Sequence, residues 1–273
     1  MSDIALKGIE DRGINNKIEE VFIAKKALMP FITAGDPDLE TTKEIMLCLD
    51  RNGADLIEVG IPFSDPLADG PVIQAAGQRS LQSGTNLKKI LEMLASIQDK
   101  MNTPYLLMGY INPILSYGKD RFIKDAIAVG VSGVIIPDLP FDQDEDFLHK
   151  LIDNNLSPVL MVTPVTSDSR LELIGKLSRG FIYCVSLLGI TGSQQGPMVS
   201  IKSYLDKVRS YTDLPLALGF GIDGPEKVKK ILEPVDGVII GTALVKIIEK
   251  YGDNKEELLD AIGEFILEIK EVM

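Results

Sequence analysis

The 273-residue sequence predicts an α/β fold, a closed (β/α)8 barrel, and three observations support this prediction. Short apolar runs rich in β-branched residues recur at roughly even intervals, an amphipathic stretch follows each of them, and the pattern repeats eight times. The length is close to the ~250 residues of one such barrel, and no Pro/Ser-rich linker or charge run divides the chain. We therefore expect residues 1–273 to form a single TIM-barrel domain. An open doubly wound sheet is the alternative fold.

The expected elements alternate strictly between strand and helix along the chain. The strand candidates are residues 27–35, 54–60, 104–110, 131–138, 157–164, 180–188, 214–221 and 236–243. The helix candidates that follow them are 41–52, 86–100, 119–130, 142–155, 169–178, 200–211, 225–234 and 243–252. Extra helices are expected at 3–12 as a plug under the barrel, at 70–83 after the second strand and at 254–271 at the C-terminus. A dinucleotide-binding fold has little support, because the first strand is not followed by a G-x-G-x-x-G turn.

The charge, the apolar runs and the cysteine and histidine content of the chain exclude several kinds of binding partner and metal site. The chain carries 28 Lys and Arg against 40 Asp and Glu, a formal charge of −12 that disfavours nucleic acid or an anionic membrane as partner. No apolar run approaches the ~20 residues of a membrane span, and the N-terminus lacks a signal or transit pattern, so a cytoplasmic protein is expected. Cys48 and Cys184 are expected to be buried, reduced thiols. His149 is the only histidine and lies in a charged helix pattern, which excludes a histidine-based metal site.

The segment EVGIPFSDPLADGP, from Glu58 to Pro71, places two carboxylates around a stiff hinge. Glu58 lies at the C-terminal end of the buried strand pattern ADLIEV, where apolar neighbours disfavour its charged form and raise its pKa, as in a general acid/base. Asp69 lies beyond two prolines in an irregular loop that can reach back over the strand end. These features favour a pair of catalytic carboxylates over a helix cap or a surface charge.

Other unusual residues also follow the strands of the predicted barrel. Because the C-terminal ends of all strands meet at one rim, and catalysis in such barrels occurs there, these residues are expected to share a site. They are Phe31 to Asp36 after the first strand, Tyr110 and Asn112 after the third, Asp138 after the fourth and Tyr183 in the sixth.

Three glycine-marked turns follow the last three strand candidates: Gly189 to Gly192, Gly219 to Asp223, and Gly241 with Thr242. Glycine lets backbone approach an oxyanion, and a helix N-terminus offers N–H groups and a partial positive charge. No Lys or Arg lies inside these turns. The sequence therefore predicts a phosphate site held by backbone N–H groups and the Thr242 hydroxyl.

Nearly the whole chain resembles the tryptophan synthase alpha subunit family. The resemblance rests on PFITAGDP, IEVGIPFSDPLADGPVIQ, LMGYINPI, GVIIPDLP, GITG, GFGI and DGVIIGTALVKIIE. It implies a lyase of tryptophan biosynthesis that splits indole-3-glycerol phosphate into indole and glyceraldehyde 3-phosphate. It also implies that this chain has no cofactor or metal of its own, and that its partner in an α2β2 complex is a beta subunit carrying pyridoxal phosphate.

The resemblance also implies roles for particular residues. Glu58 is then the acid/base, Asp69 binds the indole N–H and stabilises developing positive charge, and Tyr183 supports Glu58. The apolar walls of the indole pocket are Phe31, Ile73, Met108, Tyr110, Ile135, Met161 and Phe220. The phosphate cradle comprises Thr191, Gly192, Gly221, Gly241 and Thr242. We expect residues 64–70 and 189–197 to form a lid that responds to the partner.

The sequence departs from the family pattern at one position and is compatible with three competing functions. Some members of the family have an arginine where this chain has Leu187, and the loop GSQQGPM that follows is uncharged, which bears on closure of the lid. Another phosphate-binding aldolase or isomerase is a second enzyme class, although no strand carries the lysine that a Schiff-base aldolase uses. A free-standing lyase that releases indole and a non-catalytic regulatory barrel are the second and third competing functions.

Overall fold

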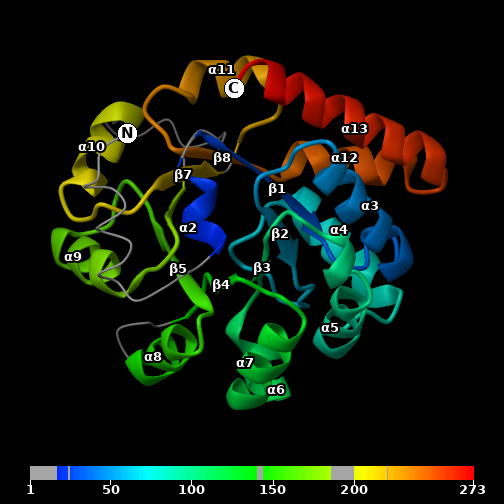
Figure 1. Ribbon diagram of the computed structural model, residues 1–273, viewed down its shortest axis with the longest axis horizontal. Helices are drawn as coiled ribbons and strands as arrows, with labels where there is room; N and C mark the ends of the chain where they lie inside the picture. The colour runs from blue at the N-terminus through cyan, green and yellow to red at the C-terminus, as the bar shows by residue number, and fades with distance from the viewer. Residues whose placement is uncertain (1–16, 24, 140–143, 186–199, 220) are drawn as a thin grey trace.

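The structure, a computed structural model, describes residues 17–23, 25–139, 144–185, 200–219 and 221–273. Its parallel strands pair in chain order from β1 to β8, and β8 pairs with β1, so the sheet closes into a barrel (Figure 1). The strands are β1 (Ala27–Thr33), β2 (Ile57–Gly60), β3 (Tyr105–Met108), β4 (Gly133–Ile135), β5 (Ser157–Val162), β6 (Ile182–Val185), β7 (Leu216–Gly219) and β8 (Gly237–Ile240). The predicted (β/α)8 barrel is confirmed, and the open sheet is wrong because β8 pairs with β1 and leaves no edge strand.

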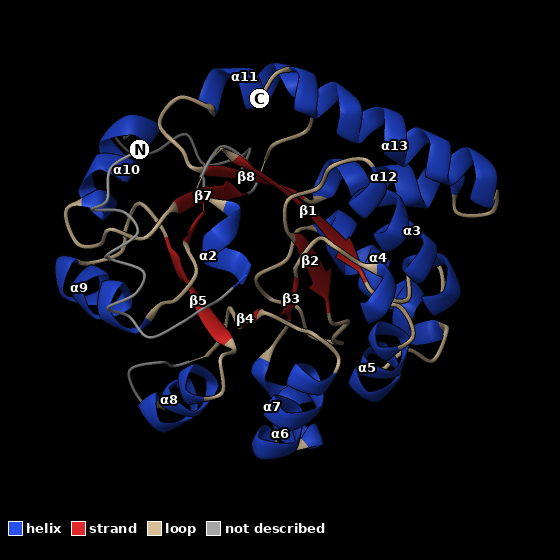
Figure 2. Ribbon diagram, viewed as in Figure 1, coloured by secondary structure: helices blue, strands red, loops and turns tan. Residues whose placement is uncertain are grey.

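Helices surround the barrel on its outside (Figure 2). The helices that follow the strands are α3 (Leu39–Arg51), α5 (Leu87–Ala95), α7 (Lys119–Ala128), α8 (Glu145–Asp153), α9 (Asp168–Leu177), α10 (Ile201–Arg209), α11 (Pro225–Ile231) and α12 (Thr242–Tyr251). The additional ones are α2 (Lys17–Val21), α4 (Pro71–Gln82), α6 (Ile111–Tyr117), the short 3₁₀ helix η1 (Gln98–Lys100) and α13 (Lys255–Glu271). The expected helices at 70–83 and 254–271 are therefore present as α4 and α13.

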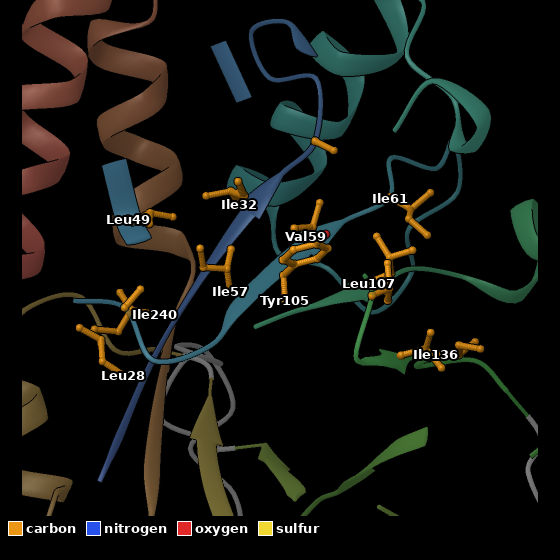
Figure 3. Close-up of a cluster of buried hydrophobic side chains, with 14 of the residues drawn as sticks. Leu28, Ile32, Leu49, Ile57, Val59, Ile61, Tyr105, Leu107, Ile136 and Ile240 are labelled. Carbon is orange, nitrogen blue, oxygen red and sulfur yellow. The ribbon is translucent and has the colours of Figure 1, made fainter. Parts of the chain in front are cut away.

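The two faces of the strands build two separate cores. Successive residues of a strand point to opposite faces, so Met29 and Phe31 face the barrel interior while Leu28 and Ile32 face the helices. Figure 3 shows part of the outer core, where strand residues such as Leu28, Ile32 and Ile57 lie near Leu49 of α3. Burying each such side chain contributes ~1.5–3 kcal/mol, and this outer layer fixes the helices on the barrel.

Helix α2 closes one end of the barrel interior. Its Ile18 is fully buried, and a Cβ added at Gly133 or Gly180 would come within 2.7 or 2.8 Å of the Ile18 side chain. The rings of Phe22 and Phe181 also pack there, with centroids 5.6 Å apart. Residues 17–22 therefore fill the end of the barrel opposite the C-terminal ends of the strands. The expected plug at 3–12 lies outside the described residues.

Helix α6, which contains Pro113, was not among the helices expected from the sequence. The proline is the third residue of the helix, in the first turn, where a backbone N–H has no partner within the helix and its loss costs little. The helix starts directly after Tyr110, and its first N–H, from Ile111, donates to the Asp138 carboxylate at 2.9 Å. Asp138 thus links the segments that follow β3 and β4. None of the helices in the described segments is long and apolar enough to cross a membrane.

Candidate active site

Glu58 is a fully buried carboxyl group inside the barrel. It lies on β2 between Phe31 of β1 and Leu106 of β3 in the strand register. Its side chain is 0% exposed, and neither carboxylate oxygen has a hydrogen-bond partner among the described residues. Burial without a compensating donor raises the pKa of Glu58 well above its ordinary value. Burial therefore favours the protonated form of Glu58, which can deliver a proton to a bound molecule.

Asp69 lies on the loop that joins β2 to α4. Its backbone N–H donates to the Pro66 carbonyl at 3.0 Å, and the Gln74 side chain donates to the Asp69 carbonyl at 2.8 Å. Tyr110 holds the same loop, because its hydroxyl accepts a hydrogen bond from the Ala68 N–H at 3.0 Å and bonds to the Asp69 carboxylate. Burial raises the pKa of Asp69 to about 6, against the lowering effect of the Tyr110 hydrogen bond. Asp69 is thus mainly ionised at neutral pH, whereas burial favours the protonated form of Glu58.

Tyr183 lies across the barrel on β6 and is 3% exposed. Burial, together with the negative charges of Glu58 and Asp69, raises the pKa of its phenol well above the ordinary value. The ring occupies space that a side chain at residue 219 would take, since a Cβ on Gly219 would lie 2.4 Å from the Tyr183 hydroxyl. The structure therefore places the three predicted catalytic residues close enough for the charges of Glu58 and Asp69 to act on Tyr183. The raised pKa keeps Tyr183 a neutral phenol.

A mostly apolar pocket opens beside Asp69. It encloses about 390 Å³, counting the part that is open to solvent. Four of the predicted indole-pocket residues line it together with Asp69: Phe31, Ile73, Met108 and Tyr110. The predicted wall residues Ile135 and Met161 belong to the inner barrel layer beneath it. The arrangement fits a flat apolar ring with one polar group, because Asp69 supplies the charged acceptor in the pocket.

The predicted phosphate cradle is described in part. Gly221 has a φ of +75°, a conformation that favours glycine. Helix α12 begins at Thr242 after Gly241 without a side-chain cap, as do α4, α6, α7, α8 and α11. An uncapped N-terminus leaves N–H groups for an anion. Thr191, Gly192, Phe220 and Leu187 lie outside the described residues.

The structure also shows two residues near the site, Lys227 and Arg79, that the sequence did not single out. Lys227 of α11 donates to the Gly221 carbonyl at 2.8 Å, so a cation does lie beside the predicted cradle. Arg79 of α4 binds Asp36 after β1, and Thr33 lines the pocket. The motif PFITAGDP pointed to Thr33 and to Asp36, the partner of Arg79, but no motif in the sequence pointed to Lys227 or Arg79. Lys227 and Arg79 lie in ordinary amphipathic patterns and reach the site only through folding.

Two predictions about titratable side chains are confirmed. Cys48 and Cys184 are buried and form no disulfide, and His149 is exposed on α8. Across the described segments, no cluster of three or more His, Cys, Asp or Glu side chains could hold a metal ion.

Comparison with known proteins assigns the family. Residues 21–273 match the family model "Tryptophan synthase alpha chain". The chain is 54% identical over 255 residues to the tryptophan synthase alpha chain of Petrotoga mobilis, covering 93% of this chain and 99% of that protein. The crystal structure of tryptophan synthase subunit alpha from Legionella pneumophila matches with a TM-score of 0.87 and 35% identity, covering 94% of this chain and 98% of that one. A chain of the tryptophan synthase complex from Pyrococcus furiosus matches with a TM-score of 0.78 and 35% identity, over 89% and 98% of the two chains. The chain described here belongs to the tryptophan synthase alpha chain family, the lyases that cleave indole-3-glycerol phosphate in tryptophan biosynthesis.

Proposed function

We propose that this chain cleaves indole-3-glycerol phosphate to indole and glyceraldehyde 3-phosphate, with Glu58 as its acid/base. The observation that carries the proposal is the buried Glu58 carboxyl group without a hydrogen-bond partner among the described residues. A protein retains such a destabilising group where its proton is used. The neighbouring apolar pocket with Asp69 at its edge suits the indole end of this substrate. Chains of this family carry no cofactor themselves, since pyridoxal phosphate belongs to the beta subunit.

In the proposed reaction Glu58 gives one proton to the substrate and takes up another from it. Protonated Glu58 first gives its proton to the ring carbon that bears the glycerol phosphate chain. The ring becomes positively charged, and the ionised Asp69 accepts a hydrogen bond from the ring N–H and stabilises that charge. The carbon–carbon bond then breaks, its electron pair neutralises the ring, and the adjacent glycerol hydroxyl gives its proton to Glu58 as it becomes the aldehyde. Tyr183 supports Glu58 in this scheme.

The phosphate end of the substrate is proposed to bind at the start of α12. Gly221, Gly241 and Thr242 contribute backbone N–H groups and a hydroxyl, with Thr191 and Gly192 completing the cradle. The family assignment and the uncapped start of α12 support this placement. Phe31 packs against Gly241, whose added Cβ would lie 3.3 Å from the ring, so the indole and phosphate ends of the site share a wall.

Alpha chains of this family normally pair with a beta subunit, and we propose an α2β2 complex for this chain in the cytoplasm. Two exposed apolar side chains support a docking face at the open end of the barrel. Leu67 on the β2–α4 loop is 95% exposed, and Leu115 on α6, which follows β3, is 50% exposed. Both lie on segments that follow the C-terminal strand ends, so a partner covering them would also close the pocket.

Measurement of both products from purified chain and indole-3-glycerol phosphate tests this proposal. We expect indole and glyceraldehyde 3-phosphate in equal amounts, with a rate that rises when a beta subunit is added. Equal rates with and without the partner would instead indicate a free-standing lyase. A chain that binds substrate but forms neither product would indicate a regulatory barrel.

A further inference from the structure

Thr33, the last residue of β1, has a buried hydroxyl group for which the described residues provide no hydrogen-bond partner. Its side chain is only 4% exposed. Two other buried threonines contrast with it: Thr42 donates to the Asp38 carbonyl at 2.8 Å, and Thr103 donates to the Ala54 carbonyl at 3.1 Å. A buried hydroxyl without a partner destabilises the folded state. Packing alone would therefore favour valine, which has the same shape, at residue 33.

The Thr33 side chain lies in the pocket that also contains Asp69. In the strand register Thr33 is opposite Gly60, two residues beyond Glu58 and toward the open end of the barrel. Across the pocket, Gly77 of α4 presents no side chain, and nothing lies within 4 Å of a Cβ added there. The hydroxyl therefore faces a space bounded by β1, β2 and α4, the helix to which the Asp69 loop leads.

Among the described residues that line the pocket, Asp69 is the one with a carboxylate to accept from this hydroxyl. Most of the lining side chains are apolar, and the Tyr110 hydroxyl already accepts from Ala68 and bonds to Asp69. A carboxylate has two oxygens with about four lone-pair sites, so Asp69 can bind Tyr110, a ring N–H and one more donor. A second protein donor would fix the direction of the carboxylate, which a single bond to Tyr110 leaves free to rotate.

We propose that Thr33 is a positioning residue, whose hydroxyl donates to the Asp69 carboxylate when an indole ring fills the pocket. The bond holds the other Asp69 oxygen toward the ring N–H. This role rests on the proposed function, since it assumes that Asp69 reads the indole nitrogen. This role explains why residue 33 is a threonine, although its hydroxyl has no hydrogen-bond partner among the described residues of the free chain.

The test compares Thr33→Val and Thr33→Ser with the parent chain, with calorimetric binding of indole and of benzofuran, which has an oxygen in place of the N–H. We expect Thr33→Val to reduce the preference for indole by about tenfold, while its affinity for benzofuran stays the same. Thr33→Ser restores the preference because it restores the donor. The melting temperature of Thr33→Val is expected to be equal to or above that of the parent, since no hydrogen bond is lost.

Thr103→Val is the matched control, because Thr103 precedes β3 at the closed end of the barrel and its hydroxyl has a partner. It should lower the melting temperature and leave the indole preference unchanged. An unchanged preference in Thr33→Val overturns the positioning role. A parent chain that does not distinguish indole from benzofuran overturns it together with the role of Asp69. Selective, Thr33-dependent binding in a chain without lyase activity would instead overturn only the proposed function.

Discussion

Arg79 of α4 binds the buried carboxylate of Asp36 with two parallel hydrogen bonds, Nε to Oδ1 and Nη2 to Oδ2, both 2.8 Å long. Asp36 is 1% exposed and lies in the loop after β1. The remaining guanidinium nitrogen, Nη1, donates to Glu249 of α12 at 2.9 Å. One side chain therefore joins the helix that follows Asp69, the loop after β1 and the helix that begins at the predicted phosphate cradle.

Arg79→Gln should destabilise the fold because it leaves the Asp36 carboxylate buried without its cation. We expect a loss of about 2–3 kcal/mol in the free energy of unfolding, below the ~3–5 kcal/mol of a fully buried pair because the Arg79 side chain is 31% exposed. Denaturant titration measures the change. Arg121→Gln breaks an exposed pair with Asp125 and should cost much less stability than Arg79→Gln. Similar losses in the two variants would show that Asp36 tolerates its charge without Arg79.

Glu58→Gln should abolish the proton transfer and make the fold less sensitive to pH. Turnover is expected to fall ~100- to 10,000-fold, with substrate binding largely retained. Because burial raises the pKa of Glu58, the contribution of this group to the stability of the parent is greatest at low pH and is lost as pH rises through the raised value. The variant lacks this decline. Single-turnover kinetics and unfolding curves at several pH values measure both effects, and a variant with nearly full turnover excludes Glu58 as the acid/base.

Protonation of Asp69 should cause the loss of activity at low pH, the acid limb of the pH profile of kcat/KM. Its pKa of about 6 means that it loses its charge as the pH falls below 6, so kcat/KM should decline there with a midpoint near 6. The groups around it are Tyr110, Glu58 and Tyr183, and burial raises the pKa of each. Asp69→Asn should remove the limb and most of the activity.

Asp65→Asn is the matched control for Asp69→Asn, since Asp65 lies on the same loop but is exposed. In the isolated chain, we expect it to change cleavage little and to keep the acid limb. If both variants lose activity equally, the loop acts as a whole and Asp69 has no separate role.

Thr242→Val should weaken binding of the phosphate end alone. It removes a hydroxyl at the start of α12 without adding bulk, so KM for indole-3-glycerol phosphate should rise about tenfold while affinity for free indole stays unchanged. Gly241→Val is a poorer choice, because a side chain there meets the Phe31 ring and would disturb the indole end as well. Calorimetry with both ligands decides the matter, and parallel losses would point to a general disturbance of the site.

Residues 64–70 are expected to become protected from hydrogen exchange when a beta subunit binds. Leu67 in this segment is 95% exposed, and residues 189–197, the second part of the predicted lid, lie outside the described structure. A partner that covers Leu67 would order the Asp69 side of the site and raise the cleavage rate. Mass spectrometry of the free chain and the complex, each with a substrate analogue, measures protection. Equal exchange in both would place the partner elsewhere.

The sequence by itself was enough to predict the barrel and to identify Glu58 and Asp69 as the main candidate catalytic residues. Eight alternating apolar and amphipathic segments leave few other ways to bury both faces of the strands, and the motif around Glu58 and Asp69 is local, so its residues are neighbours in the chain. The boundaries were less precise. The strands are shorter than the apolar runs because the ends of those runs turn toward the helices, and α6, whose proline lies in the first turn, was not among the expected helices.

Only the tertiary structure decided what surrounds each candidate. Whether the Glu58 carboxyl and the Thr33 hydroxyl have partners depends on side chains from other strands, which sequence spacing does not give. The same holds for Arg79, which meets Asp36 from 43 residues away, and for Lys227, which reaches back to Gly221. Local pattern sets the direction of a side chain along its own element. Burial, charge and hydrogen bonding arise where elements meet, and the closed barrel brings β1, β2, β6 and α4 together at a single site.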